Sequence, residues 1–305
     1  MNILITGSNG LIGKSLTKEL LRYKNKLICI DKTIAKNDFK NMKIKKIRLD
    51  ILNKKELLRK LKNFNLDLII HLGAFLGVSD TEKNEFKCLN TNIEGTKNIL
   101  ELGKKLHIKR IIFASSSEVY GDGYKSIMNE KDKLIPKSSY GISKLTAEAF
   151  VKAHSIKCKI NYNILRFFNI YGPNQRKNFV IPKLITNVKN NRNLKIYGTG
   201  NQVRCFCHIN DAVRAIHLII QKGKKNKIYN VGNNYEPITI LSLAKKIKYL
   251  SKKKLKIEKI PFDRSDRTLK REIFYRKPDI TEIIKDTDYK PRIKLNSGLL
   301  EMIEK

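Results

Sequence analysis

The first 21 residues constrain the fold more than any other part of the chain. A short apolar stretch at positions 3–5 leads into glycines at positions 7, 10 and 13, and an amphipathic pattern follows. This order predicts a strand, a tight turn and a helix whose free N–H groups face an anion. Gly7 permits the turn, Gly10 lets the backbone approach a pyrophosphate, and Gly13 allows close packing of helix on strand. The segment therefore predicts a dinucleotide-binding α/β unit.

A carboxylate follows the second apolar stretch. Residues 27–30 read Leu-Ile-Cys-Ile, and Asp31 comes directly after them. At the end of a strand this carboxylate can accept hydrogen bonds from the hydroxyls of an adenosine ribose, which favours NAD over NADP. The neighbouring Lys32 would attract a 2′-phosphate, and an aspartate here is also an ordinary turn residue.

Apolar stretches alternate with helical patterns along the chain. Strands are expected over residues 2–6, 27–30, 44–48, 67–72, 110–114, 162–167, 194–197, 203–209 and 228–231. Helices are expected near residues 11–23, 54–63, 88–106, 139–155, 180–190, 212–221 and 239–251. The alternation predicts an α/β fold, a Rossmann-type doubly wound parallel sheet with helices on both faces. We expect residues 1–168 to form the NAD-binding domain, which also receives segments from about 204–232, and residues 169–305 to form a smaller C-terminal substrate-binding lobe.

The composition is strongly basic but contains no discrete basic tail. There are 64 Lys and Arg against 28 Asp and Glu, a formal net charge of +36, and the lysines occur in nearly every segment. Such a charge causes nonspecific adhesion to nucleic acid at low salt, but we expect no specific nucleic-acid partner.

The cysteines and the hydropathy indicate a compartment. No apolar stretch is long enough to span a bilayer, and five scattered cysteines fit a reducing environment. We therefore expect a cytoplasmic protein without a membrane partner. Cys205, Cys207 and His208 lie close together, but no second pair of ligands accompanies them, so we expect no metal.

A tyrosine and a lysine stand four residues apart on a predicted helix. Tyr140 and Lys144 would face the same way, one turn apart. A tyrosine with a pKa of about 10 is a poor base at neutral pH, but an ammonium group and a positively charged nicotinamide ring favour the phenolate. Tyr140 would then accept a proton from a sugar hydroxyl as hydride leaves the carbon. Taken alone, the pair is also compatible with an ordinary helix surface.

Polar residues stand where a predicted strand ends, directly before these two. The segment RIIFASSSEVYG at 110–121 places Ser115, Ser116, Ser117 and Glu118 at this end. Ligands bind at the carboxyl ends of strands in open α/β sheets. A serine hydroxyl there would bridge the substrate oxygen and Tyr140, whereas the alternative is a serine that caps a following helix.

Together these motifs resemble the extended short-chain dehydrogenase/reductase family. The resemblance rests on GSNGLIG, Asp31, the set Ser116, Tyr140 and Lys144, and the later segments RFFNIYGP and GTGNQVRCFCHINDAV, in the family's order from Met1 to about residue 300. More narrowly, the chain resembles NAD-dependent nucleotide-sugar epimerases, dehydratases and decarboxylases. The resemblance implies NAD as cofactor and a nucleotide-diphosphate sugar as substrate.

The resemblance also implies a role for each matching residue. The cofactor residues would be Gly7, Asn9, Gly10, Leu11, Ile12 and Gly13 at the pyrophosphate, Asp31 and Lys32 at the ribose, Asp50 and Ile51 at the adenine, and Leu72, Gly73, Ala74, Asn92, Tyr140 and Lys144 beyond it. The family usually has alanine where Gly73 stands. The substrate residues would be Ser117, Asn169, Phe179, Tyr197, Arg204 and Arg276, and the catalytic residues Ser116, Tyr140, Lys144 and Glu118.

The reaction is predicted from the residues after the catalytic serine. Family members first oxidise carbon 4 of the sugar. A 4,6-dehydratase carries Asp then Glu after the catalytic Ser or Thr, whereas Ser116 is followed by Ser117 and Glu118, which argues against dehydration. We predict a 4-epimerase, which returns hydride to the opposite face of the sugar. A UDP-glucuronate decarboxylase, in which Arg276 would hold the sugar carboxylate, is the alternative, and a non-catalytic NAD-binding or nucleic-acid-binding protein is an alternative of a different class.

The resemblance further implies a homodimer. In the family the helix that carries the catalytic tyrosine and the long helix before it pair with their two-fold mates. The apolar contacts expected from these helices are Ile93, Ile99, Leu100, Leu145, Phe150 and Val151.

Overall fold

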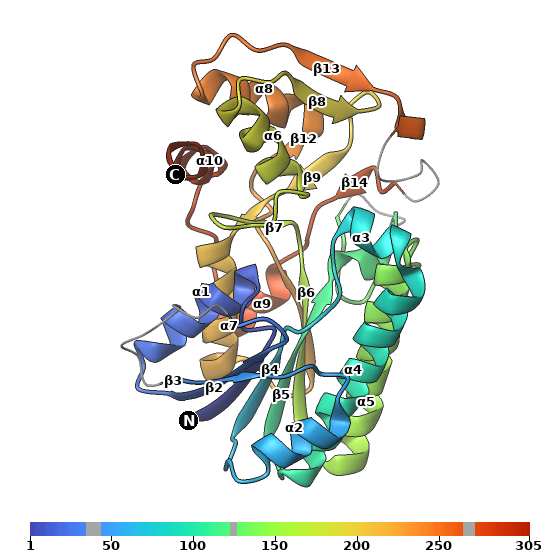
Figure 1. Cartoon of the computed structure of the whole chain (residues 1–305), viewed down its shortest axis with the longest axis vertical. Coiled ribbons are helices and arrows are strands. Elements are labelled where there is room, and N and C mark those ends of the chain that lie inside the picture. Colours follow the sequence, from blue (N-terminus) through green and yellow to red (C-terminus); the bar gives the residue numbers. More distant parts are fainter. Residues whose placement is uncertain (35–43, 123–126, 265–271) are drawn as a thin grey trace.

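The computed structural model describes residues 1–34, 44–122, 127–264 and 272–305. A larger body built on a central sheet lies below a smaller lobe in Figure 1. The N-terminus belongs to the sheet, and the C-terminus follows helix α10 (Leu295–Glu304) of the smaller lobe.

The larger body contains a parallel sheet of seven strands. Their spatial order is β11-β6-β5-β4-β1-β2-β3, and each neighbouring pair is parallel. The strands are β1 (Asn2–Thr6), β2 (Lys26–Asp31), β3 (Ile44–Arg48), β4 (Leu68–His71), β5 (Arg110–Ser116), β6 (Asn161–Phe167) and β11 (Lys227–Val231). The predicted Rossmann-type fold class is confirmed, and so is the late strand predicted at 228–231, which completes one edge of the sheet.

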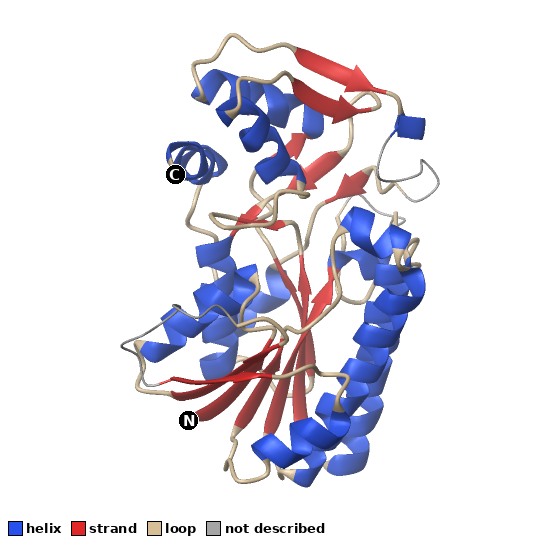
Figure 2. Ribbon diagram, viewed as in Figure 1, coloured by secondary structure: helices blue, strands red, loops and turns tan. Residues whose placement is uncertain are grey.

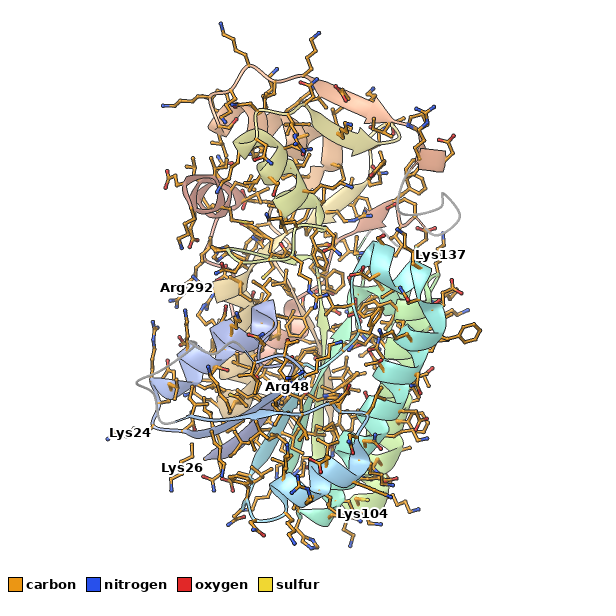
Figure 3. The ribbon with its side chains drawn as sticks, viewed as in Figure 1. Lys24, Lys26, Arg48, Lys104, Lys137 and Arg292 are labelled. Atoms are coloured by element: carbon orange, nitrogen blue, oxygen red, sulfur yellow. The ribbon has the colours of Figure 1, made fainter. Side chains whose placement is uncertain are left out.

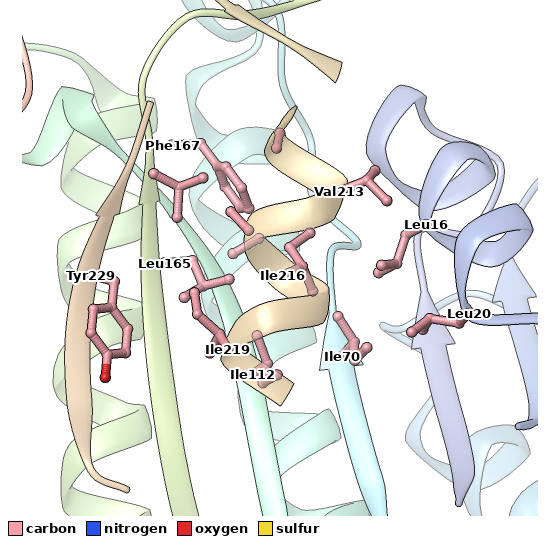
Figure 4. Close-up of a cluster of buried hydrophobic side chains, with 14 of the residues drawn as sticks. Leu16, Leu20, Ile70, Ile112, Leu165, Phe167, Val213, Ile216, Ile219 and Tyr229 are labelled. Carbon is pink, nitrogen blue, oxygen red and sulfur yellow. The ribbon is translucent and has the colours of Figure 1, made fainter. Parts of the chain in front are cut away.

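Helices cover both faces of the sheet (Figure 2), because successive residues of the buried strands point to opposite sides. Ile3 and Ile5 belong to one hydrophobic core and Leu4 to the other. The first face carries α1 (Leu11–Leu21), α7 (Ile209–Lys222) and α9 (Thr281–Thr287), and the second carries α2 (Lys54–Leu61), α4 (Glu85–Lys105) and α5 (Ser139–Cys158). Figure 4 shows the first core, in which Ile216 and Ile219 of α7 lie towards the sheet and Val213 lies beside Leu16 of α1.

The smaller lobe has its own hydrophobic core. It contains α6 (Val180–Lys189), α8 (Ile240–Leu250), α10 and three small sheets. These sheets pair β8 (Leu194–Tyr197) with β13 (Ile257–Ile260), β7 (Ile170–Tyr171) with β10 (Cys207–His208), and β9 (Val203–Cys205) with both β12 (Pro237–Thr239) and β14 (Tyr275–Arg276). The strand β14 brings Arg276 from late in the sequence beside Arg204.

The structure departs from the predicted elements in several places. The strand predicted over 203–209 is divided into β9 and β10, and α7 begins at Ile209 because the His208 ring nitrogen Nδ1 accepts a hydrogen bond from the Asn210 backbone N–H. A helix that was not predicted, α3 (Val78–Lys83), precedes α4, and Ser117–Tyr120 form a 3-10 turn, η1.

The expected dimer contacts on α4 and α5 are partly wrong. Ile99, Leu100 and Val151 are buried inside the chain, in the core between these helices and the sheet. Apolar periodicity shows which residues of a helix are buried, but not whether its own sheet or a partner covers them. The large apolar side chains that α4 and α5 expose are Phe86, Ile142, Phe150 and Ile156.

Basic side chains project from several parts of the molecule. In Figure 3, Lys24 and Lys104 lie on the larger body, and Lys137 and Arg292 lie near its boundary with the smaller lobe. Across the described ranges, no helix combines the length and the apolar character needed to cross a membrane. Within the same ranges no three His, Cys, Asp or Glu side chains gather where they could hold a metal ion. All five cysteines are described, and all are free thiols.

Candidate active site

A cavity of about 680 Å³ lies between the carboxyl ends of the sheet strands and the smaller lobe. It brings together residues that are up to 269 positions apart, since both Gly7 and Arg276 line it. With one exception, Asn92, every predicted site residue lines this cavity: Gly7, Asn9, Gly10, Leu11, Ile12, Gly13, Asp31, Lys32, Asp50, Ile51, Leu72, Gly73, Ala74, Ser116, Ser117, Glu118, Tyr140, Lys144, Asn169, Phe179, Tyr197, Arg204 and Arg276.

The glycine turn leaves backbone N–H groups open at the start of α1. Gly7 has a φ of +66°, and Gly10 is the N-cap residue, with no side-chain cap and no acidic residue in the first turn of the helix. A Cβ atom at Gly7 would lie 2.7 Å from the Gly73 nitrogen, and one at Gly13 would lie 2.3 Å from the Gly7 carbonyl oxygen. These positions therefore require glycine, and the exposed N–H groups fit a dinucleotide pyrophosphate.

The carboxylate of Asp31 is held in place by the backbone. The Asn9 N–H donates to Oδ2 and the Thr33 N–H to Oδ1, both at 3.0 Å. The residue ends β2 beside the glycine turn, where a ribose would follow the pyrophosphate. Asp50 and Ile51 line the same end of the cavity, and the Leu52 N–H donates to Asp50 Oδ1 at 2.9 Å. This arrangement fits the adenosine half of NAD.

Gly73 stands where the family usually has alanine, and its neighbours explain this difference. Its N–H donates to Thr6 Oγ1 at 3.0 Å, and an added Cβ atom would also lie 3.0 Å from that oxygen. The hydroxyl of Thr6 in turn lies 2.6 Å from His71 Nδ1. Alanine at 73 would press on this buried hydrogen-bonded pair, so glycine suits the residues beneath it.

The three principal catalytic candidates meet at the end of β5. Ser116 is the last residue of this strand, and Tyr140 lies in the first turn of α5. The side chain of Ser116 is near enough to the Tyr140 hydroxyl to lower its pKa. Lys144, one turn further along, donates from Nζ to the Ala114 carbonyl at 2.8 Å and lies 5.8 Å from the centre of the Tyr140 ring. The structure therefore assembles a serine, a tyrosine and a lysine beside the glycine turn.

Burial controls the protonation of this set. Burial lowers the pKa of Lys144 to about 8, which leaves most of the ammonium charged at neutral pH. Burial and the nearby Glu118 carboxylate raise the pKa of Tyr140 above its usual value, while the Ser116 side chain and the charge of Arg276 oppose this rise. Tyr140 is therefore protonated in the protein alone, and the expected phenolate depends on the positive charge of a bound nicotinamide ring.

Glu118 lies between the catalytic helix and the smaller lobe. Its Oε2 accepts a hydrogen bond from Ser138 Oγ at 2.6 Å, and its Oε1 lies 3.7 Å from the Arg276 guanidinium. The guanidinium is almost fully buried. Its charge acts on Tyr140, so Arg276 is close to the reacting end of the cavity.

Asn92 lies behind the site rather than in it. It is 2% exposed, its Oδ1 accepts from the Phe75 N–H at 2.7 Å, and its Nδ2 donates to Ser143 Oγ at 2.9 Å. Ser143 in turn donates to the Tyr140 carbonyl at 2.7 Å. Asn92 therefore links the loop after β4 to the helix that carries Tyr140, and its expected contact with the cofactor stays a prediction.

The distal end of the cavity is formed by the smaller lobe. Arg204 donates to Glu272 Oε1 at 2.6 Å, and Lys183 donates to the Tyr197 hydroxyl at 2.9 Å. Asn169, at a φ of +42°, donates to the Cys205 carbonyl. Sequence reasoning missed several lining residues here, because an isolated polar or aromatic side chain gives no periodic signal of its own: Arg176, Lys183, Gln202, Phe262 and Glu272.

Comparisons with known proteins agree with this geometry. The model of the NAD dependent epimerase/dehydratase family matches residues 3–232. The chain is 32% identical to UDP-N-acetyl-alpha-D-glucosaminuronate decarboxylase of Bacillus cytotoxicus, over 99% of this chain and 96% of that protein. It is 35% identical to dTDP-D-glucose 4,6-dehydratase of Dictyostelium discoideum, over 80% of this chain and 61% of that protein.

A solved structure, UDP-glucose 4-epimerase of Thermotoga maritima with UDP-glucose, superposes with a TM-score of 0.92 at 25% identity, over 100% of this chain and 98% of that one. Relatives thus include a decarboxylase, a dehydratase and an epimerase, and the expected resemblance and cofactor are confirmed at the level of the family. The chain belongs to the NAD-dependent epimerase/dehydratase family.

Proposed function

We propose that this protein oxidises carbon 4 of a nucleotide-diphosphate sugar, with Tyr140 as the proton acceptor. The proposal is supported by the meeting of Ser116, Tyr140 and Lys144 at the carboxyl edge of the sheet, in one cavity with the glycine turn and two arginines. Ser116 would hold the substrate oxygen beside Tyr140, and the Lys144 ammonium would stabilise the tyrosinate that accepts the proton. Bound NAD would accept the hydride from carbon 4 and later return it.

Arg204 and Arg276 support the substrate class. Both guanidinium groups are largely buried in the cavity wall, and planar guanidinium groups bind phosphate or carboxylate through two parallel hydrogen bonds. Tyr197 lines the same end and offers an aromatic face on which a base would stack. A nucleotide diphosphate would thus occupy the smaller lobe while its sugar reaches Tyr140.

For the second step the geometry best supports loss of carbon dioxide from a uronic acid. The single observation behind this choice is that Arg276 lies 3.7 Å from Glu118 and acts on Tyr140, so the arginine would reach the sugar of a bound substrate. Oxidation at carbon 4 makes the carbon 6 carboxylate a β-keto acid. The bond between carbons 5 and 6 then breaks, its electron pair enters the ketone, carbon dioxide leaves, and carbon 5 takes up a proton.

The 4-epimerase predicted from the sequence is the second candidate. It requires only that the keto sugar turn over inside the cavity and take hydride back on its other face. The full-length similarity to a solved 4-epimerase favours it. In that reaction Arg276 would bind only the pyrophosphate.

Product analysis separates the candidates. The protein is incubated with UDP-glucose, UDP-glucuronate and UDP-N-acetylglucosaminuronate, and products are followed by mass spectrometry and NMR. Release of carbon dioxide from a uronic acid supports decarboxylation, whereas an unchanged mass with inverted carbon 4 supports epimerisation. No turnover of any of these or of other nucleotide sugars would leave the non-catalytic alternatives.

Two variants sharpen the choice. In a decarboxylase, Glu118→Gln and Arg276→Lys should both depress kcat strongly while saturation with substrate remains attainable. In a 4-epimerase acting on a neutral sugar, Arg276→Lys should mainly raise KM, because it removes binding that is equal in the ground and transition states, and Glu118→Gln should matter much less.

We place this activity in the cytoplasm, a proposal that the five free thiols support.

A further inference from the structure

The helix that carries Tyr140 begins at a serine whose hydroxyl makes two hydrogen bonds. Ser138 is the N-cap residue of α5, and its Oγ accepts a hydrogen bond from the Gly141 N–H at 3.0 Å. The same hydroxyl donates to Glu118 Oε2 at 2.6 Å. An N-cap needs only the first bond. The second bond joins the start of α5 to η1, which follows the catalytic strand.

The backbones at this junction are also in direct contact. A Cβ atom at Gly141 would lie 2.8 Å from the Glu118 carbonyl oxygen and 2.9 Å from Pro136 Cβ. Glycine is therefore needed for η1 to approach the first turn of α5. This contact does not involve the Ser138 hydroxyl, so it supports the junction independently.

The junction forms a continuous series of hydrogen bonds from Ser116 to the residue after Tyr140. The Glu118 N–H donates to Ser116 Oγ at 3.2 Å, the Glu118 carboxylate accepts from Ser138, and Ser138 accepts from Gly141. Tyr140 directly precedes Gly141 in the first turn of α5, so the two ends of this series lie at Ser116 and beside Tyr140. A displacement of the Glu118 side chain would therefore be transmitted to the distance between Ser116 and Tyr140.

The remaining oxygen of Glu118 faces the smaller lobe. Oε1 lies 3.7 Å from the guanidinium of Arg276, which belongs to β14. One carboxylate thus contacts the N-cap of the catalytic helix with one oxygen and a substrate-binding candidate with the other.

We propose that Ser138 is a positioning residue that couples Glu118, and through it Arg276, to the first turn of α5 and thereby fixes the Tyr140 hydroxyl against Ser116. The inference rests on the proposed function for its kinetic consequence, but not for its structural one. An anionic substrate group that binds Arg276 would weaken the electrostatic attraction between Arg276 and Glu118. The hydrogen bond from Ser138 to Glu118 would then transmit the resulting shift of the Glu118 side chain to the first turn of α5, which carries Tyr140.

The kinetic test uses substitutions that separate capping from coupling. Ser138→Asp retains an oxygen that can cap Gly141 but has no proton to donate to Glu118, whereas Ser138→Thr retains both functions. We expect Ser138→Asp to lower kcat by about tenfold, the equivalent of one hydrogen bond to a charged group, with KM within about twofold of wild type. Ser138→Thr should restore most of kcat, and Ser139→Ala, at the adjacent half-buried position, is the matched control. Unchanged kcat in Ser138→Asp would overturn the proposal.

A structural test does not require turnover. Amide hydrogen exchange at Gly141 is measured in wild type and in Glu118→Ala, where Ser138 is still present. Coupling predicts that exchange at Gly141 becomes at least severalfold faster, because the hydroxyl loses the acceptor that orients it. Exchange equal to wild type would show that Ser138 is a simple cap. If the protein turns over no nucleotide sugar, the proposed function is wrong, but hydrogen exchange at Gly141 still tests the role of Ser138.

Discussion

Tyr140 is the residue on which the proposed chemistry depends most directly. We expect Tyr140→Phe to lower kcat by at least about a hundredfold, because the general base is removed while the ring and its packing remain. Affinities for NAD and for the nucleotide sugar, measured by calorimetry, should stay close to wild type. Turnover equal to wild type would remove Tyr140 from the catalytic role.

His71 contributes a pH dependence of stability that is separate from catalysis. It lies in the sheet beneath Gly73, between the hydroxyls of Thr6 and Thr96, and burial lowers its pKa to about 3. The folded state therefore excludes a proton that the unfolded chain binds below a pH of about 6.5. The contribution of neutral His71 to the free energy of unfolding is fully present above that pH and is lost as the pH falls towards 3. At pH 5 the loss is about 2 kcal/mol.

The variant His71→Gln should reduce the difference between the free energies of unfolding at pH 7 and pH 5 by about this amount. Urea denaturation at the two values measures it. His107→Gln changes an exposed histidine and should retain the wild-type difference. Equal differences in all three proteins would contradict the assignment to His71.

At the scale of elements, the glycine turn is the best-determined unit. A Cβ atom at Gly13 would lie 2.3 Å from the Gly7 oxygen and 2.7 Å from Ser8 Cα, both backbone atoms that cannot move without separating α1 from β1. We expect Gly13→Ala to cost about 1–3 kcal/mol of stability and to weaken NAD binding by at least about tenfold, a loss of roughly 1.4 kcal/mol in binding free energy. Fluorescence titration with NAD measures the second effect. Ser15→Ala, in the next turn of the same helix, should bind NAD like wild type.

Sequence patterns predicted those parts of the site that lie on regular elements. The glycine spacing, Asp31 at the end of β2, and the four-residue interval from Tyr140 to Lys144 each follow from the geometry of one strand or one helix. The bond from Ser138 to Glu118 and the pair of Arg204 with Glu272 join segments that are distant in sequence or lie in loops. No local rule specifies such partners, because only tertiary packing brings them together.

At the scale of the whole molecule, exposed apolar side chains on two helices bear on assembly. We expect a homodimer through α4 and α5, whose outer surfaces expose Phe86, Ile142, Phe150 and Ile156. Light scattering at micromolar protein and physiological salt should give twice the monomer mass, and Phe150→Glu should shift the protein towards monomer. Tyr249→Glu changes an exposed aromatic residue on α8, away from these helices, so it serves as the matched control and should leave the mass unchanged. A monomeric wild type would contradict the expectation.

The path of the chain between the two parts has a consequence for how such an enzyme can be altered. The sheet is completed by β11 and covered by α7 and α9, all of which follow the first segments of the smaller lobe in sequence. A fragment ending at residue 168 would leave β6 with an open edge and Leu165 and Phe167 uncovered. A single crossover between relatives therefore cannot exchange the larger body or the smaller lobe as an intact unit. New substrate preferences must arise by substitution within the loops and short strands around the cavity.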